Sequence, residues 1–254
     1  MAEYHRCFHP GIPAEVAVTK RHPMAISAEV SVAVMVYRSV PWMRFVLEGL
    51  RSSHTDIPYD LMVVGNDPSL SLLGTHHLTH VYTDPTPEAH YLVRVYRCWN
   101  WIVDHALTPW VVLMNSDMYV FDGWLDALWA HRHEGIPTSL LVESGAIPSF
   151  FPEYVMNCGR TPQTFDRERW WDLAGTLRKD GMGEVRDDGL FMPVLLNKAA
   201  YIAAGGYPEG NVSTAGGVVS GDRWLFEHLA SIQGPHRTIM DSVVYHVQEG
   251  EMRS

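Results

Sequence analysis

Apolar residues in this chain occur in short, almost uninterrupted runs that alternate with stretches of helical spacing. Val30–Val36 is a β-branched run of strand length, and comparable runs follow at 61–64 and 110–114, with a weaker one at 80–82. Runs that are apolar at consecutive positions suit strands that are covered on both faces, as in a parallel sheet. The pattern therefore predicts buried parallel strands in the first half of the chain.

Helical spacing fills the intervals between these runs. Pro41 stands where a helix can begin, since the first helical position needs no N–H, and from about 88 to 106 the apolar residues fall on one face. A third helix is predicted after Asp122, taken as its N-cap, with an apolar stripe over 124–129. Strands and helices that alternate in this order favour a right-handed, doubly wound α/β sheet, in which ligands bind beyond the carboxyl ends of the strands.

From about residue 143 the chain becomes richer in Pro and Gly. The elements predicted there are a helix at 166–178, a strand at 190–196, a short helix ended by Gly205-Gly206, a helix at 222–232 and a last strand at 243–246. We expect the later strands to join the same sheet. The chain then forms one domain, with an irregular lead-in over 1–28, a first half over 29–142 and a second half over 143–254.

Composition argues against several classes of function. The 254 residues include 19 basic and 29 acidic side chains, which gives a net charge of −10. Electrostatic binding to nucleic acid or to an anionic membrane instead requires clusters of Lys and Arg. The three cysteines are far apart and form no C-x-x-C pair, which argues against a disulfide scaffold and against a zinc–thiolate site. No apolar run is long enough to span a membrane, so we expect a cytoplasmic protein without a membrane span.

The tripeptide Asn115-Ser116-Asp117 directly follows the apolar run at 110–114. A carboxylate at the carboxyl end of a central strand points into the cleft where ligands bind. One Asp with a polar neighbour can hold Mg²⁺ or Mn²⁺ that also takes phosphate oxygens. The alternative is that Asp117 only caps the turn.

Two later residues are further candidates for chemistry. Asp222 opens the predicted helix at 222–232, after a glycine-rich stretch. It is either the N-cap of that helix or a general base that takes a proton from an incoming hydroxyl. His246 ends the final predicted strand, where a histidine is either structural or a ligand of a metal held by a nearby carboxylate.

Taken in order, these features resemble the family 2 inverting glycosyltransferases with a GT-A (Rossmann-like) fold. The resemblance rests on the opening strand Val30–Val36, a second strand that runs into Gly65-Asn66-Asp67, the metal motif, the late acidic residue and the final His, and it covers most of residues 30–246. It implies a single α/β domain with a mixed, mostly parallel central sheet flanked by helices. The family's metal motif is commonly D-x-D. Asn115 replaces the first acid here, which leaves Asp117 as the main ligand.

The resemblance also implies where a nucleotide-sugar donor binds. Residues 29–142 form the donor half, and the positions implied for the donor are Val36, Tyr37, Arg38, Asn66, Arg94, Arg97, Asn115 and Ser116. Asn66 stands where the family usually offers an Asp to the pyrimidine, which leaves the nucleobase open, with a UDP-sugar as the expected donor. Arg94 or Arg97 would neutralise the diphosphate, which suits bidentate arginine chemistry; the alternative for both is a surface helix arginine.

The implied reaction is a single displacement by a hexosyltransferase-like, inverting enzyme. Asp222 deprotonates the acceptor hydroxyl, and Mn²⁺ or Mg²⁺ held by Asp117 and His246 stabilises the leaving diphosphate. The loop 211–220 either orders over the bound donor or is ordinary surface. Residues 143–254 form the acceptor half. Its aromatic residues suit either stacking on an acceptor or a packed core, and they are Phe150, Phe151, Tyr154, Trp170 and Trp171.

The sequence leaves the acceptor open among a glycan, a lipid carrier, a metabolite, a protein and a modified nucleic acid, and it leaves the oligomeric state open as well. Two other functions are also open. A nucleotidyltransferase would need a glycine-rich, basic phosphate loop after the first strand, which residues 38–41 do not supply. A catalytically inactive nucleotide- or sugar-binding module is compatible with Asn66 and Asn115, which replace acidic residues of the family.

Overall fold

The computed structural model describes residues 28–37, 39–66 and 79–250 of the chain. The predicted lead-in over 1–28 therefore lies almost wholly outside the described residues, as do Arg38 and Asp67. No helix in the described ranges combines the length and the hydropathy that crossing a bilayer requires.

The described residues form one nine-stranded sheet, a separate two-stranded hairpin and the helices around them. The strands of the sheet are β1 (Val30–Val36), β2 (Tyr59–Gly65), β3 (His80–Val81), β4 (Trp110–Asn115), β5 (Met118–Val120), β6 (Ile136–Glu143), β7 (Val185–Asp187), β8 (Val194–Asn197) and β11 (His236–His246). The hairpin consists of β9 (Val212–Thr214) and β10 (Gly217–Val219). The helices are α1 (Val40–Ser52), α2 (Tyr91–His105), α3 (Trp124–Ala130), α4 (Arg167–Asp180), α5 (Lys198–Ala203) and α6 (Gly221–Gln233), with a short 3₁₀ helix at Pro152–Tyr154.

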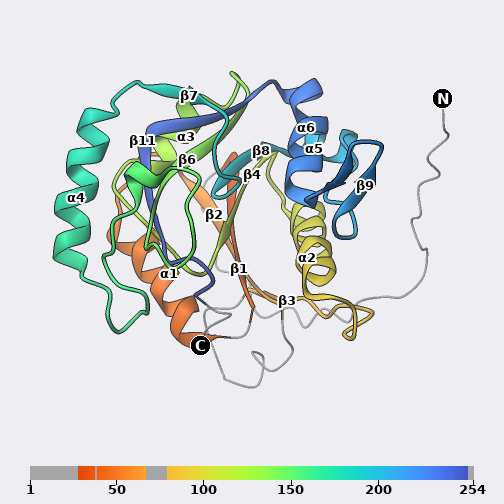
Figure 1. Cartoon of the computed structure of the whole chain (residues 1–254), viewed down its shortest axis with the longest axis horizontal. Coiled ribbons are helices and arrows are strands. Elements are labelled where there is room, and N and C mark those ends of the chain that lie inside the picture. Colours follow the sequence, from red (N-terminus) through yellow and green to blue (C-terminus); the bar gives the residue numbers. More distant parts are fainter. Residues whose placement is uncertain (1–27, 38, 67–78, 251–254) are drawn as a thin grey trace.

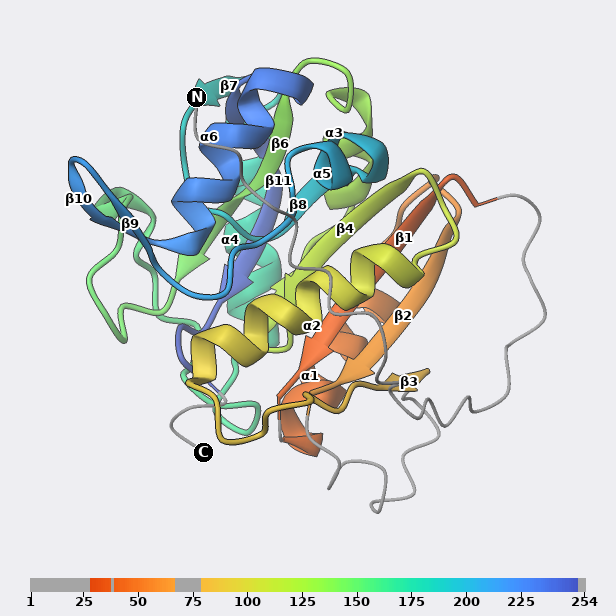
Figure 2. The same ribbon diagram turned by 90° about the vertical axis from the view of Figure 1, so that its right-hand side faces the viewer.

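The sheet is mixed and mostly parallel, as the sequence predicted. Its strand order is β3-β2-β1-β4-β8-β6-β11-β5, and β7 also pairs with β11. The pairs β1–β2, β1–β4 and β6–β11 are parallel, whereas β5, β7 and β8 run antiparallel to their neighbours. Figures 1 and 2 show α2 and α6 on one side of the sheet and α1 and α4 on the other. This double cover explains the uninterrupted apolar runs, since every residue of β1 is buried.

A second group of buried side chains fills the space between α1, α4 and β11. Trp170 of α4 belongs to it. Its side chain is 0% exposed, and its ring centroid lies 5.5 Å from that of Tyr245 in β11. Trp170 is therefore a core residue, and of the two alternatives left open for it, stacking on an acceptor is wrong. Phe150, by contrast, is 58% exposed on the segment after β6.

The N-cap predicted for the third helix is also wrong. Helix α3 begins at Trp124, and its N-cap is Gly123, whose φ of 70° is the left-handed backbone that favours glycine. Asp122 precedes this turn, and its Oδ1 accepts the backbone N–H of His54 at 2.6 Å. The Asp122 carboxylate therefore ties the start of α3 to the chain that follows α1.

Two strands of the second half have bounds other than those predicted. The strand expected at 190–196 is β8 and begins only at Val194, since Pro193 has no N–H to offer to a ladder. The last strand, expected from 243, is β11 and begins at His236. Its first residues are polar and pair with the partly exposed β7, so apolar patterning does not reveal them.

Candidate active site

His246 is the last residue of β11 and lies between two other strands. In the register of the sheet it pairs with Glu143, the last residue of the parallel strand β6, and with Met118, the first residue of the antiparallel strand β5. Because Asp117 directly precedes Met118, this register places one carboxylate on each side of the imidazole. Nε2 of His246 lies 3.6 Å from Oδ2 of Asp117, and Nδ1 lies 3.3 Å from Oε1 of Glu143. The structure thus brings Asp117 and His246 together and adds Glu143 to them.

Both carboxylates are shielded from water, with Asp117 7% exposed and Glu143 4% exposed. Burial would lower the pKa of His246, but the charges of Asp117 and Glu143 raise that pKa above its ordinary value. Burial would raise the pKa of Glu143, but hydrogen bonds, chiefly with His246, bring it below its ordinary value. Because buried charges need a compensating partner, two carboxylates around one imidazole favour the binding of a cation.

The chain after β11 folds back onto Asp117. The backbone N–H of Val247 donates to the Asp117 carbonyl at 3.0 Å, and the N–H of Gly250 donates to Oδ2 of the Asp117 carboxylate at 3.0 Å. A Cβ on Gly250 would lie 2.7 Å from the Trp42 ring and 2.9 Å from Cβ of Asp117. Only a glycine permits this approach, which fixes the orientation of the carboxylate.

The donor atoms beside Asp117 fit a divalent cation that is shared with another ligand. Imidazole nitrogens and carboxylate oxygens bind such ions at roughly 2.0–2.2 Å, so one ion can contact both Nε2 and Oδ2 across their separation of 3.6 Å. No group of three or more His, Cys, Asp or Glu side chains within the described residues is arranged to hold a metal by itself. The pair is therefore suited to an ion that completes its shell with phosphate oxygens and water.

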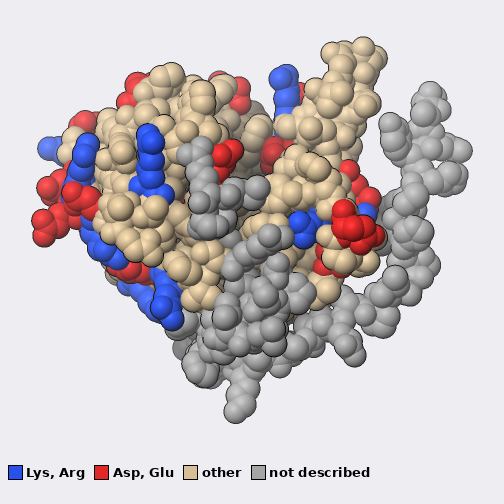
Figure 3. Space-filling model, turned by 60° about the horizontal axis from the view of Figure 1, so that its bottom comes forward, with Lys and Arg blue, Asp and Glu red and all other residues tan. Residues whose placement is uncertain are grey.

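The first two residues of the predicted metal motif lie on the turn that leads to Asp117. Asn115 ends β4, where it pairs with Met35 of β1 and is half-buried, and Ser116 is buried. Figure 3 shows the end of the molecule toward which the parallel strands run, where most of the visible surface of the described residues is uncharged.

The ends of β1 and β2 bring together residues expected at the nucleobase. The backbone N–H of Asn66 donates to the carbonyl of Val36 at 2.8 Å, and Tyr37 follows Val36 directly. Asn66 is only 5% exposed, and its side-chain Oδ1 has no hydrogen-bond partner within the described residues. A buried oxygen without a partner costs free energy, so this atom is ready to accept from a ligand.

The two candidate arginines of α2 have different surroundings. Nη2 of Arg94 donates to the hydroxyl of Tyr37 at 3.0 Å, and its buried Nε has no hydrogen-bond partner within the described part of the chain. Arg97 binds Glu209 through Nε at 3.1 Å and Nη2 at 2.9 Å, while Nη1 donates to Asp84 at 3.2 Å and to Thr86. Arg94 therefore keeps a donor for a ligand, whereas the protein occupies the guanidinium of Arg97.

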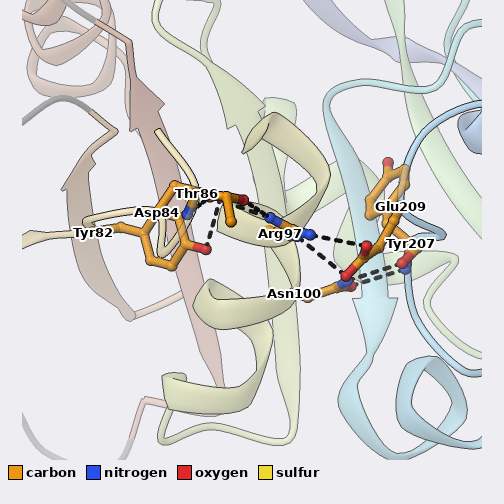
Figure 4. A network of polar contacts seen from close by, with 7 residues as sticks. All are labelled: Tyr82, Asp84, Thr86, Arg97, Asn100, Tyr207 and Glu209. Atoms are coloured by element: carbon orange, nitrogen blue, oxygen red, sulfur yellow. Dashed lines mark hydrogen bonds and ion pairs between the residues drawn. The ribbon is translucent and has the colours of Figure 1, made fainter. Parts of the chain in front are cut away.

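The Arg97 contacts belong to a network that holds the segment before the β9–β10 hairpin (Figure 4). Asn100 of α2 donates to the carbonyl of Tyr207 at 2.9 Å and accepts the N–H of Tyr207 at 2.8 Å. Together with the Arg97–Glu209 pair, these bonds fasten residues 207–209 to α2. The network positions the chain that leads to Asp222.

Asp222 lies in the first turn of α6 and is not its N-cap. The cap is Ser220, whose hydroxyl accepts the N–H of Arg223 at 3.2 Å. The Asp222 carboxylate is therefore left to accept the hydroxyl of Tyr96 through Oδ2 at 2.8 Å. Burial raises the pKa of Asp222 above its ordinary value, and the hydrogen bond from Tyr96 offsets only part of that rise. A half-buried carboxylate with a raised pKa is a suitable general base.

Close packing explains the glycine before Asp222. A Cβ on Gly221 would lie 2.4 Å from the Tyr96 ring and 2.9 Å from the carbonyl oxygen of Gly210. The absence of a side chain there lets α6 start against α2, which brings Asp222 to Tyr96. In Figure 2 the amino-terminal end of α6 lies on the same side as the carboxyl ends of β4 and β6.

Sequence patterning missed Glu143 because it did not reveal strand β6, which Glu143 ends, and it missed Tyr96 because nothing in the pattern of α2 singles out this residue as the partner of Asp222. No local signal marks such contacts. The sequence also gave no sign of a cavity of about 140 Å³ whose lining includes Trp42, Arg160 and Gly250, the last of which binds Asp117 through its N–H.

No protein-family model matches the sequence, and no curated protein matches it. Solved structures do. S. aureus TarS 1-349 matches with a TM-score of 0.52 and 14% identity over 86% of this chain and 60% of that one. Its complex with UDP-GlcNAc gives a TM-score of 0.51 and 15% identity over 85% of this chain and 58% of that one. The chain has a GT-A fold.

This result confirms the fold class that the sequence predicted. The complex of TarS 1-349 with UDP likewise matches with a TM-score of 0.51 and 15% identity, over 85% of this chain and 60% of that one. This chain therefore spans about 60% of the length of those TarS fragments, and 36% of the longer TarS structure. Identity at this level concerns the fold, and the assignment of a reaction rests on the site.

Proposed function

We propose that this protein is a metal-dependent, inverting glycosyltransferase that moves a sugar from a nucleotide-diphosphate donor, a UDP-sugar, to an acceptor hydroxyl. The observation that carries the proposal is the pair formed by the buried Asp117 and the half-buried His246 at the carboxyl edge of the GT-A sheet. Asp222, a second shielded carboxylate with a raised pKa, supports it. The solved complexes of S. aureus TarS with UDP and UDP-GlcNAc agree with the class of donor.

Residues 29–142 are proposed to hold the donor. The Oδ1 of Asn66, which has no hydrogen-bond partner among the described residues, accepts from the nucleobase, next to Val36 and Tyr37. We assign the diphosphate to Arg94 in preference to Arg97, because Glu209 and Asp84 already occupy Arg97. The remaining residues proposed for the donor are Arg38, Asn115 and Ser116.

Asp117 and His246 are proposed to hold Mn²⁺ or Mg²⁺, whose charge stabilises the diphosphate as it leaves. The N–H of Gly250 keeps the Asp117 carboxylate in place through its 3.0 Å bond to Oδ2. Asp117 and His246 supply only two metal-ligating atoms, so phosphate oxygens of the nucleotide-sugar are expected to complete the coordination of the ion. Nucleotide binding and metal binding should therefore strengthen each other.

Asp222 is proposed to act as the general base. Its carboxylate takes the proton of the acceptor hydroxyl as that oxygen bonds to the anomeric carbon, and the bond from that carbon to the diphosphate breaks with its electron pair on phosphate oxygen. The raised pKa of Asp222 makes it a stronger base than an exposed Asp. The Tyr96 hydroxyl orients the carboxylate through the 2.8 Å bond to Oδ2.

Residues 143–254 are proposed to bind the acceptor. Phe150, which is 58% exposed, and its neighbour Phe151 lie on the segment that follows β6, and their ring centroids are 4.9 Å apart. Such rings suit stacking on a sugar or another flat group. The β9–β10 hairpin, where Val218 is 70% exposed, is proposed to close over the bound donor.

The decisive experiment compares Asp222→Asn with Glu227→Gln, an exposed carboxylate on the same helix that pairs with Arg223. Release of UDP from UDP-GlcNAc and other UDP-sugars is measured with and without Mn²⁺ and acceptor hydroxyl compounds, and UDP affinity is measured by calorimetry. We expect Asp222→Asn to lose turnover and keep UDP affinity, and Glu227→Gln to match the parent.

Turnover retained by Asp222→Asn would refute the assignment of the base. UDP affinity unaffected by a chelator would refute the metal site. Binding of UDP-sugars without turnover on any acceptor would favour the inactive binding module, for which Asn115 in place of an acid is the specific observation.

A further inference from the structure

The imidazole of His246 faces a different carboxylate at each ring nitrogen. Nδ1 lies 3.3 Å from Oε1 of Glu143 and within hydrogen-bond reach, whereas Nε2 lies 3.6 Å from Oδ2 of Asp117. The strand register sets this arrangement, because Glu143 is the direct neighbour of His246 in the parallel pair β6–β11. The backbone N–H of Ser144 also donates to the carbonyl of His246 at 3.0 Å.

This geometry selects one tautomer of the neutral ring. An ionised carboxylate only accepts hydrogen bonds, so the bond to Glu143 requires the proton on Nδ1. Nε2 then presents a lone pair toward the Asp117 carboxylate. Two electron-rich atoms that face each other across 3.6 Å repel each other unless a proton or a metal cation lies between them.

We propose that Glu143 is a positioning residue that holds the proton of His246 on Nδ1 and so keeps Nε2 open as a metal ligand. This inference rests on the proposed function, in which Asp117 and His246 hold the cation. Without Glu143 the proton moves to Nε2 and donates to Asp117, which closes the gap between the two donor atoms. Carboxylates that bind the far nitrogen of a metal-ligating histidine play this part in other metal sites.

The position of Glu143 suits this role better than a purely structural one. It ends a strand whose eight residues are all buried, and it is itself 4% exposed. A carboxylate there costs desolvation free energy, and the hydrogen bonds that offset this cost, with His246 first among them and with Ser149 and Gln248 after it, bring the pKa of Glu143 below its ordinary value. Its backbone carbonyl accepts the N–H of Met156 at 3.0 Å, which anchors the residue from its other side.

The test uses Glu143→Ala, Glu143→Gln and His246→Ala, with Glu153→Gln as the control. Glu153 is an exposed carboxylate on the segment that follows β6, and it pairs with Arg186. The first measurement is Mn²⁺ affinity in the presence of UDP, by calorimetry and by electron paramagnetic resonance. We expect Glu143→Ala to weaken Mn²⁺ binding about 10–100-fold. The Mn²⁺ affinity of Glu143→Gln should lie between those of Glu143→Ala and the parent, because its amide oxygen still accepts from Nδ1. The Mn²⁺ affinity of Glu153→Gln should match that of the parent.

The second measurement is the tautomer of His246, read from ¹⁵N chemical shifts of the ring in the metal-free protein at a pH above its titration. We expect Nδ1–H in the parent and in Glu153→Gln, and a shift toward Nε2–H in Glu143→Ala. Glu143→Gln keeps the volume of the side chain and provides a folded variant if Glu143→Ala is unstable. An unchanged tautomer together with parental Mn²⁺ affinity in the Glu143 variants overturns the proposal.

The two proposals fail in different ways. If His246→Ala weakens Mn²⁺ binding and the Glu143 variants do not, the metal site stands and the role of Glu143 is refuted. If His246→Ala leaves Mn²⁺ affinity unchanged, the metal site of the proposed function is refuted, and the role of Glu143 as a positioning residue for a metal ligand is refuted with it.

Discussion

Replacement of Trp170 by Ala tests the boundary between the core and the acceptor surface. The side chain is 0% exposed between α4 and β11, and truncation of a core Trp to Ala costs about 3–5 kcal/mol through lost burial and the cavity left behind. Typical domains have about 5–15 kcal/mol of stability. For a chain of this size the loss corresponds to a Tm lower by roughly 6–20 °C.

A second replacement separates ring size from the indole N–H. Nε1 of Trp170 is buried and has no hydrogen-bond partner within the described residues. Trp170→Phe removes this unsatisfied donor, which recovers about 1–3 kcal/mol and offsets most of the loss from the smaller ring. We therefore expect Trp170→Phe to be much less destabilising than Trp170→Ala.

The assay is urea unfolding followed by circular dichroism, together with transfer to an acceptor once one is found. Phe150→Ala is the matched control, since Phe150 is 58% exposed. Its unfolding free energy should stay within about 0.5 kcal/mol of the parent, while its use of the acceptor falls. A Trp170→Ala protein that unfolds like the parent yet loses acceptor use would refute the core assignment.

The remaining predictions concern the base and the two arginines. Tyr96→Phe removes the hydrogen bond that lowers the pKa of Asp222, so the acid limb of the pH–rate profile should move to higher pH. Because the folded-state pKa of Asp222 lies above its unfolded value, stability declines as pH rises between the two, and Tyr96→Phe should extend that decline to higher pH. Arg94→Ala should weaken UDP binding about tenfold to hundredfold, the contribution of a charge-assisted hydrogen bond. Arg97→Ala should instead lower stability by about 1–3 kcal/mol, because it leaves the buried Asp84 without its cation.

These outcomes are read from pH–rate profiles, calorimetry with UDP, and urea unfolding. If the acid limb of the pH–rate profile does not move in Tyr96→Phe, the ionisation of Asp222 does not control the rate. A loss of UDP affinity in Arg97→Ala without a loss of stability would reverse the assignment of the two arginines.

The local pattern of apolar residues was sufficient to predict strands β1, β2 and β4 of the sheet. The runs at β1, β2 and β4 are apolar at nearly every position because helices cover both faces, and that burial is written into each segment separately. The same patterning placed Asp117 after β4 and His246 at the end of the last strand. Since parallel strands end at one edge of a sheet, the sequence could predict that these two residues meet.

The sequence did not reveal β6, and the reason is physical. This strand contains the polar residues Thr138 and Ser139, yet it is buried throughout. The hydroxyl of Ser139 bonds that of Ser242 at 2.8 Å, and the hydroxyl of Thr138 bonds the His236 ring at 3.1 Å. Partners on a distant strand satisfy these groups, and no window of sequence contains them.

The sequence by itself therefore determined the class of the fold and the order of the candidate site residues along the chain. Both follow from the pattern of burial within single segments, because that pattern shows where each strand or helix ends. What only the tertiary structure decided is which residue serves which partner. Strand register set Glu143 beside His246, and the capping of α6 by Ser220 left the Asp222 carboxylate to bind Tyr96. Glu209 binds the guanidinium of Arg97, whereas Nε of Arg94 has no hydrogen-bond partner within the described residues. These choices depend on contacts between segments far apart in the chain, which local periodicity does not encode.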